Sequence, residues 1–312
     1  MNFLIRIKKK IGLLKFIIFD DIIYRYMEKK GLQFRNQVSA EMMNLPPLPS
    51  VTVPEIEMHM LCGKKQLDMG IVASWSLMRF IDNCILYVHS DGTIDDEDMI
   101  KWRHIIPGSV LIPKKEADEA VKNYLSLKYP KLYNWRVGNW AAYQLIDYSL
   151  FGKTSKIISC DSDVLCFCRP DFLLEKIKND DSGIHWNNDL HTCYSTSLES
   201  LKRITGLDIP AKFNLGFIYS PRLTDNDFTQ IEKMMEKLQH IEKFDLNHLW
   251  SSQTYFSFIV PFHHGSSPLP ENYSIRKGKK RKNTVLRHYV GIKSIRPRYF
   301  LEGWKDILNQ IQ

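Results

Sequence analysis

The chain has 312 residues, of which 44% are hydrophobic and 25% charged, and a formal net charge of +8 at pH 7. This composition is ordinary for a folded protein of one large or two small domains. The positive charge is concentrated in residues 1–30, with eight Lys and Arg against three acids, and residues 276–287, with seven against none. Because the rest is mildly acidic, we expect no nucleic acid partner, whereas the two basic segments could meet phosphates or anionic lipid.

The N-terminal segment alternates apolar residues with lysines from Phe3 to Tyr26, which predicts an amphipathic helix lying on an interface. That interface is a membrane surface, the back of the same domain or a second subunit. The longest apolar run, Ile11–Phe19, is broken by a glycine and a lysine, so no membrane span is expected. Two aspartates follow it without a small-residue cleavage site, which disfavours a signal peptide.

A proline-rich stretch at Leu45–Ser50 predicts a semi-rigid linker, so we expect an N-terminal helix with its linker at residues 1–50 and a main domain at residues 51–312. In the main domain, short apolar runs alternate with amphipathic helices, which is typical of an α/β fold with a mainly parallel central sheet and helices on both faces. The expected strands are Glu55–Cys62, Cys84–His89, Ser109–Ile112 and Lys156–Cys160, and the expected helices are Gln66–Phe80, Asp95–Ile106, Lys115–Leu127 and Val137–Ser149. Beyond Pro170 the order is mixed, with a helix to Lys178, strands near Gly183–Trp186, Phe213–Tyr219 and Thr284–Val290, and helices at Asp225–Ile241 and Leu246–Ile259.

The six cysteines lie mostly in apolar, strand-like runs, where free thiols pack as small hydrophobic groups. This distribution favours a reducing, cytoplasmic compartment. Cys166 and Cys168 could form half of a metal site, but no second Cys or His pair lies nearby at a spacing that zinc requires. We therefore expect no zinc site.

Asp-x-Asp occurs three times, at Asp96–Asp98, Asp161–Asp163 and Asp225–Asp227. The first and third open predicted helices, where acids favour the helix dipole and need no further role. Only Asp161 and Asp163 directly follow a buried-strand pattern, at the carboxyl edge where open α/β sheets place their ligands. Two such carboxylates are a costly charge pair unless a cation neutralises them, and oxygen ligands suit Mg²⁺ or Mn²⁺ with a diphosphate. The alternative is a pair of exposed loop acids.

Three motifs between residues 55 and 304 resemble the GT-A glycosyltransferases, especially the retaining group that includes glycogenin and bacterial lipopolysaccharide galactosyltransferases. Lys156–Leu165 is similar to that family's strand and Asp-x-Asp, followed by a Pro-Asp at Pro170. Phe213–Phe217 is similar to its Phe-Asn-x-Gly strand, and His288–Gly291 to its late His-Tyr-x-Gly. The resemblance implies a GT-A fold and a metal-dependent glycosyltransferase that uses a nucleotide-sugar donor, with UDP expected.

The same resemblance implies roles for individual residues. Asp161, Asp163 and His288 would hold Mn²⁺ or Mg²⁺; the alternative for His288 is a packed histidine. Asp91, in a turn that looks like that of inverting GT-A enzymes, would contact the nucleoside. The sugar and the reaction would involve Asn214, Asp189 and Gln253, although Asn214 could simply cap a turn. Arg136, Asn139 and Trp140 are further candidates for donor contacts.

Two departures from the family pattern bear on these roles. The family's Lys-Pro-Trp is absent: Lys293 comes one residue early and Arg296 later, so either cation could meet the diphosphate. The family's late Asp-Gln is Ser252-Gln253 here, which leaves Gln253 to act. The closer resemblance still favours retention.

The acceptor implied is a glycan or a lipid-linked saccharide in cell-surface polysaccharide or lipopolysaccharide synthesis. We expect a cytoplasmic enzyme whose basic ends can meet the anionic inner face of the membrane, with residues 276–287 forming an exposed, mobile loop. Two other functions remain open. One is a haloacid-dehalogenase-like phosphatase, which also places Asp-x-Asp after a buried strand but continues differently. The other is a noncatalytic adaptor that binds membranes or polyanions.

Overall fold

A computed structural model describes residues 2–240, 245, 247–292 and 295–311, with backbone alone for residues 2–20. Its main sheet has seven strands in the order β3-β2-β1-β4-β7-β6-β8. These are β1 (Ile56–Cys62), β2 (Cys84–Ser90), β3 (Val110–Ile112), β4 (Lys156–Cys160), β6 (His185–Asn187), β7 (Asn214–Pro221) and β8 (Ser267–Pro268). Neighbours from β3 to β4 are parallel, whereas β7 is antiparallel to both β4 and β6.

This strand order positions the ligand edge. From β1 the chain proceeds to β2 and β3 on one side, and β4 pairs on the other side of β1. Strand order therefore reverses between β1 and β4, and open α/β sheets form their binding crevice at the carboxyl ends of such strands. The strand prediction was correct here: β4 begins and ends as expected, with all residues after Lys156 buried.

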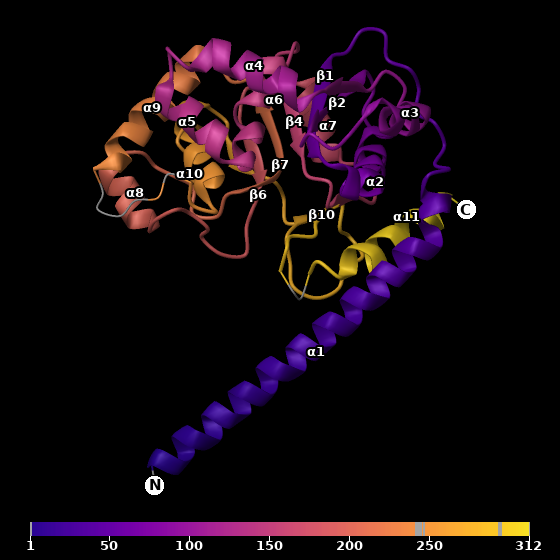
Figure 1. The fold of residues 1–312 in the computed structure, drawn as a ribbon, viewed down its shortest axis with the longest axis vertical. Coiled ribbons are helices and arrows are strands. Elements are labelled where there is room, and N and C mark those ends of the chain that lie inside the picture. Colours follow the sequence, from indigo (N-terminus) through magenta and orange to yellow (C-terminus); the bar gives the residue numbers. More distant parts are fainter. Residues whose placement is uncertain (1, 241–244, 246, 293–294, 312) are drawn as a thin grey trace.

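Helices cover both faces of the sheet (Figure 1). They are α2 (Leu67–Met78), α3 (Asp96–Ile105), α4 (Lys114–Leu125), α5 (Pro130–Gly138), α6 (Asp147–Phe151), α7 (Asp171–Lys178), α8 (Leu198–Thr205), α9 (Asp225–Gln239), α10 (Ser251–Ser257) and α11 (Lys305–Ile311). Both α3 and α9 begin with capping boxes that use Asp98 and Asp227. Two of the three Asp-x-Asp matches thus lie at helix starts, as predicted, and the structure adds that each supplies a capping box.

The expected single helix Val137–Ser149 is wrong. Instead α5 ends at Gly138, and Asn139 adopts an extended conformation and accepts a hydrogen bond from the Ala141 N–H at 2.9 Å. A 3₁₀ turn, Trp140–Gln144, follows before α6. A Gly-Asn pair favours a helix end because glycine is flexible and asparagine caps the next turn. Helix α10 is also shorter than predicted, and the start expected for it, Leu246, lies outside the described residues.

A three-stranded sheet, β5 (Val164–Cys166), β10 (Leu286–His288) and β9 (Tyr273–Ser274), lies beyond β4. The basic segment 276–287 leads into β10, and part of it contradicts the exposed loop that was predicted. Lys277, Lys279 and Lys282 are exposed, but the Arg287 side chain is wholly buried and pairs with Glu302 at 2.6 Å. Burying a guanidinium is tolerated because this partner compensates its charge.

Helix α1 (Asn2–Met42) is longer than the predicted Phe3–Tyr26, and its N-terminal part projects away from the body (Figure 1). The last turns of α1 pack against the main body of the chain. Val38 and Met42 belong to the core, and Arg35 forms a bidentate ion pair with Asp68. The Trp75 indole N–H donates to the Pro46 carbonyl at 2.8 Å. Residues 35–46 therefore lie against the body, and the division at residue 50 stays a prediction.

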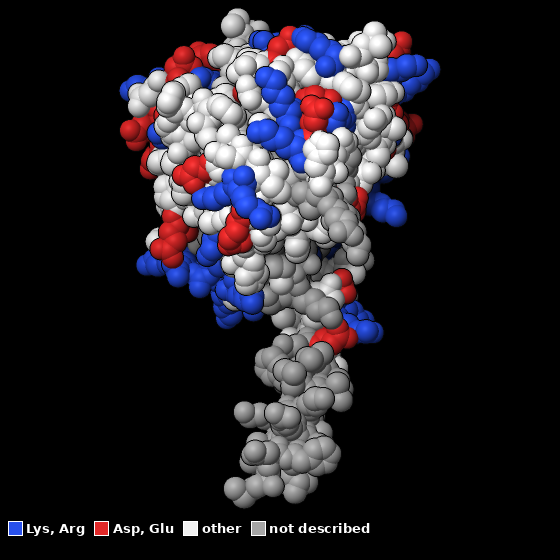
Figure 2. All heavy atoms as spheres, turned by 90° about the vertical axis from the view of Figure 1, so that its left-hand side faces the viewer, with Lys and Arg blue, Asp and Glu red and all other residues white. Residues whose placement is uncertain are grey.

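Charged side chains of both signs are mixed on one face of the molecule. On the face that Figure 2 presents, cationic and acidic side chains are interspersed over most of the surface. Such mixing produces little net field, so this face does not favour a polyanion. Among the described helices, none combines the length and the apolar content that crossing a membrane requires.

Candidate metal and nucleotide site

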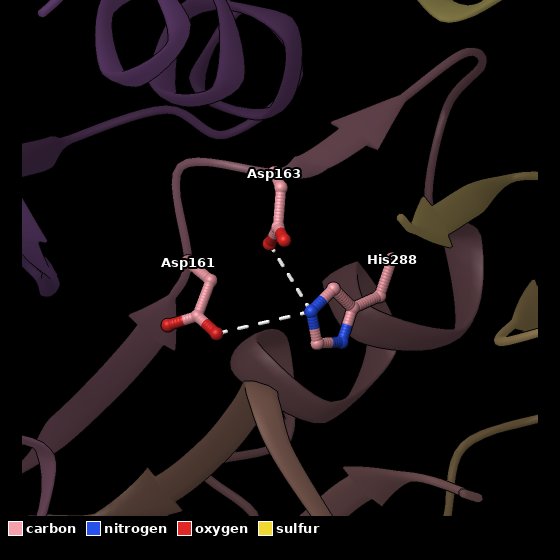
Figure 3. A group of neighbouring side chains, drawn as sticks. All are labelled: Asp161, Asp163 and His288. Carbon is pink, nitrogen blue, oxygen red and sulfur yellow. Dashed lines mark ion pairs between the residues drawn. The ribbon is translucent and has the colours of Figure 1, made fainter. Parts of the chain in front are cut away.

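Three side chains from two sheets meet at the carboxyl end of β4. Asp161 follows β4 and Asp163 precedes β5, while His288 ends β10 and pairs in register with Val164. Figure 3 shows the two carboxylates pointing toward the imidazole. His288 Nε2 lies 3.1 Å from Asp163 Oδ1 and 3.8 Å from Asp161 Oδ2. The structure therefore brings the three predicted metal ligands together, with one ligand atom from each within 4.8 Å of the others.

The electrostatics show that the two carboxylates do not ionise independently. Burial and the charge of Asp163 raise the pKa of Asp161. Burial alone would raise the pKa of Asp163, but His288 and Arg296 lower it overall, and Arg296 Nη1 lies 2.7 Å from Asp163 Oδ2. Two close carboxylates compete for ionisation, and a cation placed between them removes the conflict.

A chain of hydrogen bonds fixes which nitrogen of His288 faces the carboxylates with its lone pair. Asp189 Oδ2 can only accept, so the Asn214 amide directs Nδ2 toward it, at 2.8 Å. Asn214 Oδ1 then accepts from the Gly216 N–H at 2.9 Å and lies 3.0 Å from His288 Nδ1. Nδ1 must therefore carry the proton, and neutral His288 presents the Nε2 lone pair to Asp163.

Gly216 is required by this arrangement. A β-carbon at this position would lie 2.0 Å from Cε1 and 2.2 Å from Nδ1 of His288. Since these distances are far below van der Waals contact, any side chain here would displace the imidazole. The Asp161 N–H also donates to the Gly216 carbonyl at 2.8 Å, so one glycine adjoins two of the three predicted ligands.

These residues fit a hard divalent cation. The donor set is two carboxylates and one imidazole nitrogen, which Mn²⁺ and Mg²⁺ accept, and it leaves coordination positions for phosphate oxygens. Asp163 Oδ1 is a buried atom that accepts no hydrogen bond from the described residues. When Nδ1 of neutral His288 carries the proton, the lone pair on Nε2 points at the lone pairs on Asp163 Oδ1, and the two repel each other. A proton on Nε2 or a cation resolves that repulsion. Accordingly, burial lowers the pKa of His288 but the two aspartates raise it overall.

A cleft of about 720 Å³ opens beside the carboxylates. Its walls include Gly63 directly after β1, Asp91 in the turn after β2, the aspartate pair, and Arg296. Asp91 accepts hydrogen bonds from the Thr93 N–H at 2.9 Å and the Thr93 hydroxyl at 2.6 Å. A β-carbon on Gly63 would lie 2.1 Å from Asp91 Oδ2, so glycine leaves room for this carboxylate. Asp91 and Arg296 thus line the same cleft, and their roles toward a nucleotide stay predictions.

The other predicted residues divide into three groups. Asp189, Asn214 and Gln253 lie on the Nδ1 side of His288, where Gln253 Nε2 is 3.3 Å from Asp189 Oδ2, and they are not among the described lining residues of the cleft. Lys293 lies outside the described residues. Of the donor-contact candidates, Trp140 lines the cleft, Asn139 caps the 3₁₀ turn, and Arg136 is buried against Asp147.

Sequence reasoning missed several cleft residues. Gln144 donates to Asp161 Oδ1 at 2.6 Å, but a lone glutamine inside a predicted helix gave no signal. The second omission is helix α1, which contributes Glu28, Gly31, Leu32 and Arg35 to the cleft wall. The position of a helix against a distant crevice depends on tertiary packing and has no local pattern.

Comparisons with known proteins show structures of similar fold but no matching protein family. No family model and no curated protein matches the chain. The crystal structure of mouse xyloside xylosyltransferase 1 in its apo form superposes with a TM-score of 0.53 at 13% identity, covering 78% of this chain and 99% of that one. The apo structure of WbbM, a bifunctional glycosyltransferase, gives 0.52 at 14% identity over 85% of this chain and 53% of that one. The predicted GT-A fold is confirmed.

Proposed function

We propose that this chain is a metal-dependent glycosyltransferase that moves a sugar from a nucleotide-sugar, with UDP as the expected nucleotide, to a saccharide or lipid-linked acceptor. The observation that carries the proposal is the convergence of Asp161, Asp163 and His288 beside a cleft at the strand-order reversal of a GT-A fold. This combination places acids suited to a diphosphate-bound cation where such folds bind nucleotides. Nothing in the described residues favours the phosphatase or the adaptor.

Each residue has a part in this mechanism. Held by the three ligands, Mn²⁺ or Mg²⁺ would supply Lewis acidity to the departing diphosphate. Arg296, whose side chain is 41% exposed, would add positive charge as negative charge grows on the leaving group, and Lys293 is the second cation proposed for that role. Asp91 would hold the nucleoside. Because negative charge on the leaving diphosphate is larger in the transition state than in the bound donor, the cation and Arg296 would stabilise the transition state more than the ground state.

The remaining residues would act on the imidazole and the sugar. Asn214, anchored by Asp189, would position His288 through Nδ1, so that a lone pair on Nε2 faces the cation. Gln253 is the group proposed to contact the transferred sugar from α10, with Asp189 beside it. We favour retention of configuration, as in the enzymes that the sequence motifs resemble.

The test is metal-dependent binding of UDP, together with a screen of nucleotide-sugars for metal-dependent hydrolysis. In His288→Ala, the Mn²⁺ concentration for half-maximal UDP binding should rise about 10- to 100-fold. In the wild type the apparent affinity for Mn²⁺ should fall about tenfold per pH unit below the raised pKa of His288, because the proton competes for Nε2, and the variant should show a flatter profile. His104→Ala, an exposed histidine on α3, is the control. An unchanged midpoint with lowered thermal stability would make His288 a packing residue.

We also propose that α1 binds anionic membrane surfaces. Its described turns expose Ile22, Ile23 and Tyr26 at 59%, 39% and 62%, and lysines follow along the same helix. The chain should sediment with phosphatidylserine vesicles and not with phosphatidylcholine vesicles, and added salt should weaken binding. Removing residues 2–26, which takes away Ile22, Ile23 and Tyr26, should abolish this binding but leave Mn²⁺-dependent UDP binding intact, because the lining residues of α1 begin at Glu28. Equal binding to both lipids, or none to either, contradicts the proposal.

A further inference from the structure

A second pocket of about 450 Å³ lies between residues 269–277, residues 281–284 and the loop after β6. Its apolar lining includes Leu190, Leu269 and Tyr273, of which Leu269 and Tyr273 belong to the core. None of its lining residues is shared with the cleft beside the metal ligands. The volume is enough for a charged group together with one sugar ring, so the pocket is a ligand-sized site separate from the nucleotide cleft.

The polar lining of this pocket is cationic and incompletely paired. Arg281 is neutralised by Glu271, whereas neither Arg276 nor Lys277 is paired with a carboxylate among the described residues. Two buried atoms, Arg276 Nη1 and Ser274 Oγ, have no hydrogen-bond partner within the described part of the chain. A buried guanidinium N–H without an acceptor is costly, and an oxyanion that accepts from it removes this cost.

Buried hydrogen bonds hold the backbone of the cationic loop that lines this pocket. The buried Arg287 donates from Nη2 to the carbonyl oxygens of Gly278 at 2.7 Å and Arg276 at 3.2 Å, and its charge is compensated by Glu302. The backbone of the cationic loop is thereby tied to an internal ion pair. Lys280 adds a second tie, because its N–H donates to Glu302 Oε1 at 2.9 Å. Arg276 and Lys277 therefore lie on a backbone held in place, which lowers the entropy lost when a ligand binds.

The pocket adjoins the transfer site through the loop after β6. Asn188 and Leu190 line the pocket, while Asp189 between them accepts from Asn214, the amide that positions His288. The Asn187 amide, in the last residue of β6 before this loop, donates to the Tyr273 carbonyl at 2.9 Å, which joins the end of β6 to β9. A ligand here would contact Asn188 and Leu190, the neighbours in sequence of Asp189, which anchors the amide that positions His288.

We propose that this pocket binds a phosphate group carried by the acceptor, with Arg276, Lys277 and Ser274 as its donors. A phosphate suits three donors because it offers three accepting oxygens and a charge near −2. The proposed function assigns the donor diphosphate to the cleft beside Asp161 and Asp163, so we assign the phosphate in this second pocket to the other substrate. Naming that substrate the acceptor rests on the proposed glycosyl transfer, whereas the phosphate contact rests on this pocket alone.

Calorimetric titration of the full chain in EDTA tests the contact without the metal-bound nucleotide site. Glucose 6-phosphate should bind, inorganic phosphate should bind more weakly, and glucose should not bind. Arg276→Gln and Lys277→Gln should each weaken glucose 6-phosphate about tenfold. Lys279→Gln removes the same charge from an exposed residue of the loop that does not line the pocket, and should change the affinity less than about twofold, as expected for a screened surface charge.

Two further arms separate the outcomes. The first arm is sedimentation with phosphatidic acid vesicles. If Lys277→Gln reduces this sedimentation and Lys279→Gln does not, the phosphate belongs to a lipid headgroup. If the chain binds glucose 6-phosphate but not the vesicles, the phosphate belongs to a sugar phosphate. Mn²⁺-dependent UDP binding is measured on the same samples: if it fails in the wild type while the phosphate titration succeeds, the proposed transfer falls and the pocket stands. Equal losses in the Lys277 and Lys279 variants, or no binding of either phosphate ligand, overturn the inference.

Discussion

Replacing Asp163 by Asn should abolish metal-dependent UDP binding and sugar transfer while leaving the chain folded. The Asp163 carboxylate is 8% exposed and lies between His288 and Arg296, so it is the most enclosed oxygen donor of the site. Asn keeps the volume and the carbonyl oxygen but removes the negative charge that a divalent cation requires. Because Asp163 contributes a negative charge that neutral His288 does not, its loss should exceed the about 10- to 100-fold loss expected for His288→Ala.

The matched control is Asp96→Asn, which alters another Asp-x-Asp match at the exposed start of α3. It should bind Mn²⁺ and UDP as the wild type does. Calorimetry of Mn²⁺ and UDP binding, with thermal unfolding of both variants, distinguishes the site from a general effect of charge. Undiminished turnover in Asp163→Asn would rule out the metal site.

Gly216→Ala should impair the same site without changing any ligand. The added methyl would lie 2.0 Å from the imidazole of His288, so the ring must rotate away from Asp163 or β7 must shift. We expect the Mn²⁺ concentration for half-maximal UDP binding to rise at least about tenfold, comparable to the loss of His288 itself. The expected loss comes from steric displacement alone.

Gly291→Ala is the control, because a β-carbon there has no atom of the described residues within 4 Å. It should leave metal binding and the unfolding temperature unchanged. If Gly216→Ala binds Mn²⁺ normally, the imidazole does not lie against β7 as described. A lowered unfolding temperature in Gly216→Ala together with normal metal affinity would also contradict the expected displacement.

The parts of the site that were predictable follow local rules. Residues 157–160 are apolar or small and buried, so the strand pattern alone is enough to predict that Asp161 and Asp163 lie at a sheet edge. The acids of α3 and α9 could be set aside because helix starts favour them. His288 depended on a resemblance, since one histidine before a tyrosine has no local signature, and its pairing with Val164 joins segments far apart in the chain.

The parts that failed depend on contacts that no local window contains. The helical pattern continues through Asn139, so the sequence did not predict the interruption there. For the same reason it did not predict that Gln144 contacts Asp161. The pairing of Arg287 with Glu302 reversed the expected exposure of that part of the basic segment. Composition indicates that a cluster of cations prefers solvent, but it cannot identify the one cation that a buried acid compensates.

Helix α1 forms part of the cleft wall, and it also determines how far the cleft would lie from a membrane. From Asn2 to Glu28 it measures about 39 Å at about 1.5 Å per residue, and Glu28 already borders the nucleotide cleft. Its exposed apolar residues, Ile22, Ile23 and Tyr26, lie along the shaft near the cleft, which favours a helix lying flat on a bilayer over one standing upright. A flat helix would hold the cleft within roughly one helix diameter, about 10 Å, of the lipid headgroups. Short lipid-linked saccharides would then be within reach of the enzyme, and the growing ends of long glycans would not.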